Sequence, residues 1–244
     1  MLHKNERKLC ICIECMEHVD CLYFEFTGKG NIKLTRCQGC GNVADKYIEY
    51  ELVLILIDVL LHRKPAFRHL FYNRDTSSMY QLRSINLLIF TVIFANVTLK
   101  AIVLNSSRIH KLSGFTELFY LIILCILEHS IFILIMFGLL HIKPTPKLHI
   151  TSKINMNKLI YLSIAFPEIL KLAICILQIF ETEPIVLFLS GGLITSIQYI
   201  SLQSASNLQS NRILCGIITA LILRFSIRTF FFSLSEIWTL GIIA

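Results

Sequence analysis

The sequence lacks most of the features that mark a soluble enzyme. It has no G-x-S-x-G nucleophile elbow, no glycine-rich phosphate loop and no H-E-x-x-H pair. No polar region is large enough for a separate catalytic fold, so we expect a protein that is not an enzyme. If the protein is an enzyme, the alternative is a transferase whose catalytic residues lie inside membrane helices. No stripe of basic and aromatic residues forms a nucleic-acid groove, which excludes nucleic acid as the expected partner.

Charged residues are also scarce. They make up 16% of the 244 residues, whereas apolar residues make up 55%. The mean hydropathy is +0.68, far above that of a soluble domain, and it predicts an integral membrane protein. Residues 1–9 are polar and contain no apolar core of a signal peptide. We therefore expect the N-terminal domain to stay in the cytosol.

Cysteine is concentrated near the N-terminus in two C-x-x-C pairs. Cys12 and Cys15 form the first pair, and Cys37 and Cys40 form the second, with twenty-one residues between the pairs. This pattern is typical of four thiolates around one tetrahedral zinc ion, and it predicts a structural zinc because no coordination position is left for water. The alternatives are ordinary thiols or disulfides. Two further cysteines are close enough in sequence to be substitute ligands: Cys10 and Cys21.

A β-hairpin is expected between the two pairs. Residues 22–26 and 32–35 are β-prone, and residues 27–31 are rich in turn formers. Such a hairpin is barely stable alone, and zinc binding on the order of 10 kcal/mol would stabilise it. Gly41 follows the second pair, but Met16 follows the first, where a glycine is expected.

A series of short motifs follows in a consistent order and spacing. They are Asn31-Ile32 with Leu34, Ala44-Asp45-Lys46-Tyr47-Ile48-Glu49-Tyr50, Ile57-Asp58, Leu61-His62, Lys64, and Arg68-His69-Leu70 with Asn73. Together with CIEC at 12–15, this series resembles the homology domain of the Arv family over about the first third of the chain. Beyond about residue 80 only the hydrophobic pattern is shared.

The resemblance implies a function in lipid homeostasis. Members of the Arv family are multi-spanning proteins of the endoplasmic reticulum, tied to sterol homeostasis and to the supply of early glycosylphosphatidylinositol (GPI) intermediates. It thus implies sterol and GPI precursors as ligands, and proteins of GPI or sterol synthesis as partners. An accessory subunit, whose zinc domain holds a lipid-synthesising complex together, is the alternative of a different class.

Residues 51–62 form an apolar run that is too short to cross a bilayer. On a helix, Glu51, Asp58 and His62 share one narrow stripe, with aliphatic residues around the rest. This pattern indicates a helix in the membrane interface or a lid on the transmembrane helices. A buried helix of the zinc domain is the alternative.

Basic residues follow this run at once, beside apolar anchors. They suit an anionic cytosolic leaflet, where each is worth about 1 kcal/mol. The residues expected to contact lipid headgroups are Arg63, Lys64, Arg68 and His69. Simple anchoring by the positive-inside rule is the alternative.

Five longer apolar stretches are each roughly long enough to cross a membrane as a helix. They cover residues 85–104, 118–142, 159–180, 185–202 and 213–234. The predicted fold is an all-α multi-span membrane helical bundle with a small N-terminal zinc-ribbon-like β-hairpin domain. Its parts are a cytosolic zinc module at 1–50, the interfacial helix and basic segment at 51–83, and the bundle at 84–244. Loop cations at Lys143, Lys147, Lys153, Lys158 and Arg212 agree with this orientation.

Ionisable residues inside the apolar stretches are further candidates, because charge at membrane depth is costly and usually has a partner. Glu128, His129 and Glu168 are expected to line a polar cavity for a lipid headgroup, or else to pair between helices. Glu168 is spaced to meet Lys171 on one helix face. For Lys100, Arg224 and Arg228 we expect extension to the membrane interface.

Overall fold

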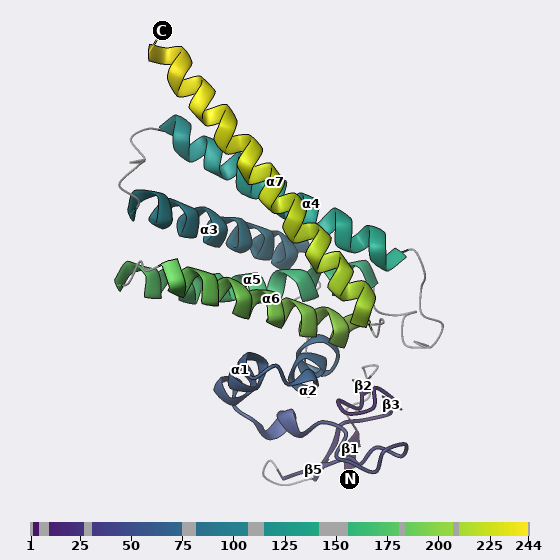
Figure 1. The fold of residues 1–244 in the computed structure, drawn as a ribbon. Coiled ribbons are helices and arrows are strands. Elements are labelled where there is room, and N and C mark those ends of the chain that lie inside the picture. The colour runs from purple at the N-terminus through teal and green to yellow at the C-terminus, as the bar shows by residue number, and fades with distance from the viewer. Residues whose placement is uncertain are drawn as a thin grey trace. The chain divides into compact units, whose positions relative to one another are not determined.

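The computed structural model describes residues 2–4, 10–26, 31–74, 82–106, 115–141, 156–180, 184–206 and 210–243 (Figure 1). The chain divides into two compact units. The first contains Met1–Ile85, Thr145–Ser163 and Ile200–Asn207, and the second contains Asn86–Pro144, Ile164–Tyr199 and Leu208–Ala244. The predicted loop cations Lys143, Lys147 and Lys153 lie outside the described residues.

The N-terminal strands form two small antiparallel sheets. Strands β4 (Tyr23–Phe26) and β5 (Ile32–Leu34) pair as the predicted hairpin, with Glu25 opposite Ile32. Strand β1 (Leu2–Lys4) adds to the other edge of β4, a pairing that the sequence did not predict. Strands β2 (Cys10–Ile11) and β3 (His18–Val19) pair on either side of the first C-x-x-C turn.

Short helices follow the second cysteine pair. They are the 3-10 helix η1 (Lys46–Glu49), α1 (Leu52–Leu60), α2 (Lys64–Arg68) and the π-turn η2 (His69–Asn73). Helix α1 ends at Leu60, and His62, which follows the capping residue Leu61, has a left-handed φ of 62°. There the His62 amide donates to the Val59 carbonyl at 3.0 Å and the Arg63 amide donates to the Asp58 carbonyl at 2.9 Å, which is a Schellman motif.

Five long helices make up most of the remaining chain. They are α3 (Leu82–Ser106), α4 (Phe115–His141), α5 (Met156–Phe180), α6 (Pro184–Ser206) and α7 (Ser210–Ile243). Each contains or closely matches one of the five predicted apolar stretches, so the helical prediction is confirmed. Helices α4 and α7 pack against each other in the second unit.

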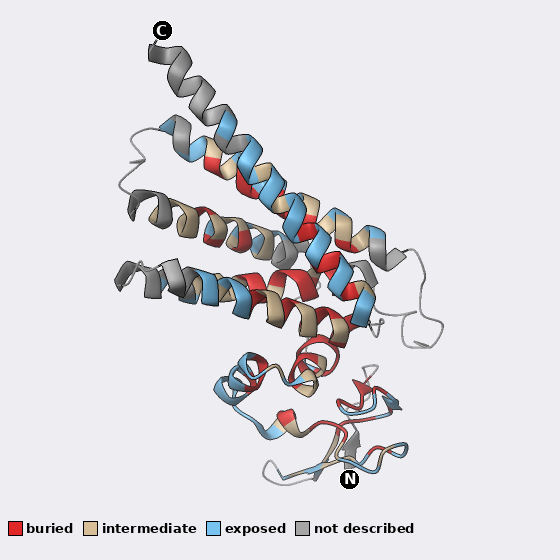
Figure 2. Ribbon diagram, in the orientation of Figure 1, coloured by how far each residue is buried: buried red, intermediate tan, exposed pale blue. Residues whose placement is uncertain are grey.

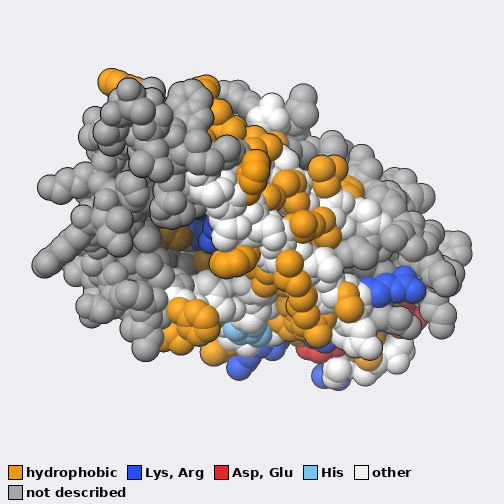
Figure 3. Space-filling view, turned by 45° about the horizontal axis from the view of Figure 1, so that its top comes forward, with side chains coloured by type: hydrophobic (Ala, Val, Ile, Leu, Met, Phe, Trp, Pro, Cys, Tyr) orange, Lys and Arg blue, Asp and Glu red, His pale blue; other side chains and the backbone are white. Residues whose placement is uncertain are grey.

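Two segments within the described residues are long and apolar enough to cross a membrane, Leu118–Gly138 in α4 and Ser210–Phe230 in α7. A shorter apolar segment covers Asn86–Ile102. Large apolar side chains on these helices are exposed, including Phe119 at 65% and Phe225 at 68%. Figure 3 shows hydrophobic side chains gathered over the visible face. A membrane crossing by all five helices stays a prediction.

Helix α5 continues through Pro167, which has no amide proton to donate to the Ser163 carbonyl one turn earlier. The hydroxyl of Ser201, on α6, donates to that carbonyl instead, at 2.7 Å. Both serines are fully buried. A side-chain hydroxyl thus replaces the backbone donor that proline removes.

Candidate metal centre and its supporting polar network

The four predicted ligands come together in one cluster. The Sγ atoms of Cys12, Cys15, Cys37 and Cys40 all lie within 4.8 Å of one another, and none of the four is in a disulfide. The sulfurs of Cys12 and Cys40 are 3.6 Å apart, as are those of Cys15 and Cys37. Zinc–sulfur bonds of about 2.3 Å in a tetrahedron place sulfurs about 3.8 Å apart. The cluster therefore fits an ion of zinc's size with four thiolate ligands.

The two C-x-x-C turns have the same backbone hydrogen bonds. The Cys12 amide donates to the carbonyl of Glu17 and the Cys37 amide to that of Asn42, both at 2.8 Å. In each turn the residue after the second cysteine donates back to the first cysteine, at 2.9 Å from Met16 and from Gly41. The matching geometry makes the two C-x-x-C turns equivalent.

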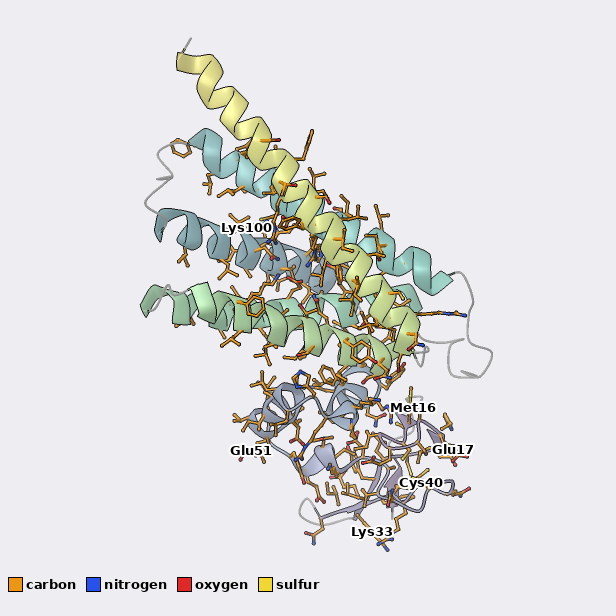
Figure 4. All side chains as sticks on the ribbon, viewed as in Figure 1. Met16, Glu17, Lys33, Cys40, Glu51 and Lys100 are labelled. Atoms are coloured by element: carbon orange, nitrogen blue, oxygen red, sulfur yellow. The ribbon has the colours of Figure 1, made fainter. Side chains whose placement is uncertain are left out.

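Met16 has the left-handed backbone that the turn requires. Its φ is 66°, close to the 73° of Gly41 at the equivalent position. A side chain in this conformation costs on the order of 1 kcal/mol, which glycine avoids. The departure from the expected glycine is thus accommodated by backbone strain and not by a different turn. Figure 4 labels Met16, Glu17 and Cys40 in the N-terminal unit.

The thiols differ in how readily they ionise. Burial raises the pKa of Cys12. Burial acts on Cys37 in the same sense, but hydrogen bonds from the backbone amides of Cys40 and Gly39, with smaller contributions from neighbouring thiols, outweigh it and leave its pKa lowered. Amide protons directed at a sulfur stabilise its thiolate, which is the form that binds a metal.

A buried carboxylate, Asp45, connects the cysteine turns to the helical segment that follows. Its Oδ1 accepts the Tyr47 amide at 2.9 Å, which caps η1. Its Oδ2 accepts from His69 Nδ1 and from Asn73 Nδ2, each at 2.7 Å. Because an ionised carboxylate only accepts, His69 carries its proton on Nδ1.

Asn73 in turn holds the strand that enters the first turn. Its Oδ1 accepts the Ile11 amide at 3.0 Å, and its Nδ2 donates to the Ile11 carbonyl at 2.8 Å. The side-chain amide thereby pairs with the backbone as a neighbouring strand would. Ile11 immediately precedes Cys12, so this pairing fixes the chain at the first ligand.

Arg68 holds the first turn itself. Its Nη1 donates to the carbonyls of Ile13 and Glu14, at 2.8 and 2.6 Å. These are the two residues between Cys12 and Cys15. One guanidinium thus satisfies two loop carbonyls that would otherwise need water. These bonds hold the turn in the conformation that brings Cys12 and Cys15 together.

Helix α1 presents its one acidic residue to this module. Asp58 is buried, and its carboxylate accepts from the Tyr47 hydroxyl at 2.8 Å and pairs with Arg63 at 3.1 Å. Burial, and next the hydrogen bond to Asp58, raise the pKa of Tyr47, so its hydroxyl stays protonated and donates.

Ile55 and Val59 of α1 are buried together with Asp58, whereas the rest of the helix is aliphatic and exposed, as its pale blue parts in Figure 2 show. Val53 is 63% exposed, whereas Asp58 is 8% exposed. The exposed aliphatic residues of α1 and its C-terminal cap are Leu52, Val53, Leu54, Leu56, Ile57, Leu60 and Leu61. A helix on a water-soluble domain exposes polar side chains to solvent, so this aliphatic surface is unusual for one.

The structure separates the four basic residues that were predicted to meet headgroups. Arg68 and His69 bind the cysteine module, through Ile13 and Glu14 and through Asp45. Arg63 pairs with Asp58 but its side chain is 55% exposed, and Lys64 is partly exposed. Headgroup contact by any of them stays a prediction. Sequence reasoning missed the supporting role of Arg68 and Asn73, although their place in the motif series was the available signal.

In the second unit, the acids inside the long helices are paired between helices. Glu128 of α4 accepts from Arg228 of α7 at 2.7 Å and from Lys100 of α3 at 2.8 Å. In contrast to the expectation that these two cations extend to the interface, both bind one buried carboxylate. Figure 4 shows Lys100 on α3.

Glu168 of α5 has a second set of partners. Lys171 binds it as predicted from their spacing, Gln198 donates to it at 2.7 Å and Asn96 at 3.1 Å. Arg224 lies at 3.7 Å. His129, the third predicted residue, is buried on α4 beside Glu128 in sequence. Pairing between helices, one of the two predicted roles, is thus what both acids do, and headgroup contact stays a prediction.

Comparison with known proteins adds to this geometry. Residues 11–205 match the Arv1-like family. The chain belongs to this family. Among curated relatives, the chain is similar to "Protein arv1 homolog" of Dictyostelium discoideum, 49% identical over 67 residues, which is 27% of each chain. It is also similar to "Protein ARV1" of Saccharomyces cerevisiae, 46% identical over 63 residues, which is 26% of this chain and 19% of the relative.

The likeness to individual Arv relatives is therefore local. "Protein ARV 2" of Arabidopsis thaliana is 45% identical over 62 residues, covering 25% of this chain and 27% of the relative. The matched segments span about a quarter of the curated relatives. No solved structure matches the chain.

Proposed function

We propose that this Arv1-like protein is a multi-pass protein of the endoplasmic reticulum membrane that serves lipid homeostasis. It aids sterol distribution within the cell and the delivery of early GPI-anchor intermediates. Membership of the family supports the lipid pathway, because that is the function that the sequence resemblance implies. The protein is proposed to act without catalysis, by handling lipid or by assembling the proteins that do.

The observation that carries a membrane role for the N-terminal unit is the exposed aliphatic surface of α1. Its acidic side is held by Tyr47 and Arg63, while seven aliphatic side chains face outward. Embedding these side chains in the interface of a bilayer contributes on the order of 1 kcal/mol each. Arg63 and Lys64 follow the helix directly, where they meet anionic headgroups. Residues 51–83 then form the interfacial segment of the protein.

The cysteine cluster is proposed to hold one structural zinc ion. Four thiolate ligands fill its tetrahedron, so zinc contributes folding free energy and no activated water. Asn73 and Arg68 hold the first turn, and the backbone amides near Cys37 favour its thiolate. The module at 1–50 is proposed to lie in the cytosol, and residues 84–244 to form the membrane bundle.

The proposed function is tested by the lipid profile of cells from which the protein is depleted. Free sterol, sterol ester and the glucosamine-bearing phosphatidylinositols are quantified together over the first hours. We expect the GPI precursors to accumulate and sterol to redistribute, and we expect the wild-type chain to reverse both. No early change in either lipid class contradicts the proposal.

A matched pair of variants connects this readout to α1. Replacing Val53 and Ile57 by serine removes exposed aliphatic groups, whereas replacing Glu49 and Glu51 by glutamine changes exposed polar groups nearby. The serine variant is expected to lose rescue and the glutamine variant to keep it. Equal rescue by both overturns the membrane role of α1.

A further inference from the structure

The described helices of the second unit hold more positive than negative charge in two adjoining sets of ion pairs. The members are the carboxylates Glu128 and Glu168 and the cations Lys100, Lys171, Arg224 and Arg228. With His129 counted as neutral, two carboxylates face four cations, which leaves a formal charge of +2. An excess of one sign among apolar helices is unfavourable unless a counter-ion is supplied.

The carboxylate of Glu128 accepts three hydrogen bonds from its two cations. Arg228 donates to it from Nε at 2.7 Å and from Nη2 at 3.2 Å, and Lys100 donates at 2.8 Å. This arrangement fixes the guanidinium of Arg228 in place. Its side chain is nevertheless 55% exposed, so it stays accessible from outside the helices.

The carboxylate of Glu168 already accepts from three close donors. Lys171, Asn96 and Gln198 all donate to it within hydrogen-bond distance. Arg224 is left at 3.7 Å, which is an ion pair but longer than a hydrogen bond.

Arg224 is therefore the cation with donors to spare. Its side chain is 12% exposed and its guanidinium lies 4.1 Å from the centre of the Phe132 ring. Among the described residues its buried Nε has no hydrogen-bond partner. A buried donor of this kind is uncommon and indicates a partner that the chain alone does not provide.

We propose that Arg224 and Arg228 together bind a phosphate group, carried by a lipid headgroup or free in solution. The two side chains lie one turn apart on α7, so they face the same side of the helix. The guanidinium fork matches phosphate oxygens, and phosphate is the anion that membranes supply in quantity. Glu128 positions Arg228, and Glu168 and Phe132 position Arg224. The choice of a lipid as carrier rests on the proposed function, whereas the anion site does not.

The test is binding by the purified full-length protein, counted by native mass spectrometry. Phosphatidylinositol is the probe, and diacylglycerol with the same acyl chains is the matched lipid without phosphate. Wild type is expected to bind phosphatidylinositol about tenfold more tightly than diacylglycerol, and Arg224→Gln to lose most of that difference. Arg212→Gln removes the same charge near the start of α7 and is expected to stay within about twofold of wild type.

Two further measurements distinguish misfolding from loss of the site, and a lipid headgroup from a free phosphate. Arg224→Lys keeps the charge without the fork, so intermediate binding supports the site. Thermal unfolding in detergent and the elution profile report whether each variant is folded. Competition by inorganic phosphate identifies a free phosphate as the ligand, and the absence of competition identifies the lipid headgroup. Equal binding of both lipids by wild type, or wild-type binding by a folded Arg224→Gln, overturns the site.

The proposed function can fail independently of this site. An altered cellular lipid profile together with phosphate-independent binding overturns the site and leaves the function standing. Binding that depends on Arg224 together with an unaltered profile overturns the function and leaves the site standing.

Discussion

Asn73 donates a 2.7 Å hydrogen bond to Asp45, 28 residues earlier in the chain, and at the same time pairs with both backbone polar groups of Ile11. One side-chain amide thus joins the end of the short-helix segment, the capping residue of η1 and the strand that leads into Cys12. The cysteine cluster is consequently part of a unit that extends to residue 73, beyond the hairpin alone.

Replacing Asn73 by alanine is expected to destabilise the N-terminal unit. The change leaves the Ile11 amide and carbonyl and one bond of Asp45 without a partner, at a cost of about 2–4 kcal/mol. Thermal unfolding of the full-length protein in detergent, followed with zinc release, measures the effect. Asn42→Ala makes the same substitution at an exposed position and is the control. Equal melting of the two variants contradicts the role of Asn73.

The local elements could be predicted from sequence because their signals are local. Cysteine spacing indicated the two turns, β-prone runs indicated β4 and β5, and long apolar stretches indicated α3 to α7. Strand β1 was missed, since its residues 2–4 gain their conformation from pairing with β4 some twenty residues later. The stripe containing Asp58 was visible on a helical projection, but its partner Tyr47 was not.

Long-range polar contacts were the main features that sequence could not provide. Arg68 was interpreted as a headgroup contact because it lies among cations beside apolar anchors, yet its bonds to Ile13 and Glu14 depend on how the chain folds back over more than fifty residues. Lys100 and Arg228 were expected to reach the interface because long cationic side chains in apolar stretches can extend to it. Their meeting at Glu128 depends on the register of three helices, which no local pattern encodes.

Glycine at position 16 is expected to be more stable than alanine, the reverse of the usual order. Both substitutions remove the methionine side chain, but only alanine keeps the strain of a φ of 66°. The free energy of unfolding of Met16→Gly is therefore expected to be about 1 kcal/mol higher than that of Met16→Ala. Thermal unfolding of the two zinc-loaded variants measures the difference. Val53, within α1, is the control position: there the alanine variant should be more stable than the glycine variant by a similar amount. The usual order at both positions would show that Met16 is unstrained.

Serine at position 37 is expected to abolish metal binding and unfold the cysteine module. So small a unit cannot replace a contribution on the order of 10 kcal/mol from zinc. Metal content by mass spectrometry and protease resistance of residues 1–74 are the readouts. Cys21→Ser is the control, because the Cys21 sulfur contacts the Thr35 hydroxyl at 3.6 Å and lies outside the four-sulfur group. Zinc retained in Cys37→Ser, with normal protease resistance, rules out the assigned ligand set.

Arg68 is expected to strengthen zinc binding. Arg68→Gln removes the donor shared by the Ile13 and Glu14 carbonyls, so the first turn loosens and zinc affinity falls about tenfold or more, the equivalent of 1.5–3 kcal/mol for a charged hydrogen bond. Competition with a chromogenic chelator measures the affinity. Lys64→Gln, which removes a nearby positive charge, should leave zinc affinity within about twofold. If the two variants hold zinc equally well and both lose binding to anionic vesicles, Arg68 acts as a headgroup contact instead.

The hydroxyl of Ser201 is expected to matter only because Pro167 is present. In the wild-type background Ser201→Ala leaves the buried Ser163 carbonyl without its donor and should lower stability by about 1–2 kcal/mol. In a Pro167→Ala background the residue at 167 regains an amide proton that reaches the same carbonyl, so the serine substitution should cost little. A double-mutant cycle by thermal unfolding in detergent gives the coupling, expected at about 1 kcal/mol. An equal cost of Ser201→Ala in both backgrounds would mean that the hydroxyl stabilises α5 and α6 independently of the proline.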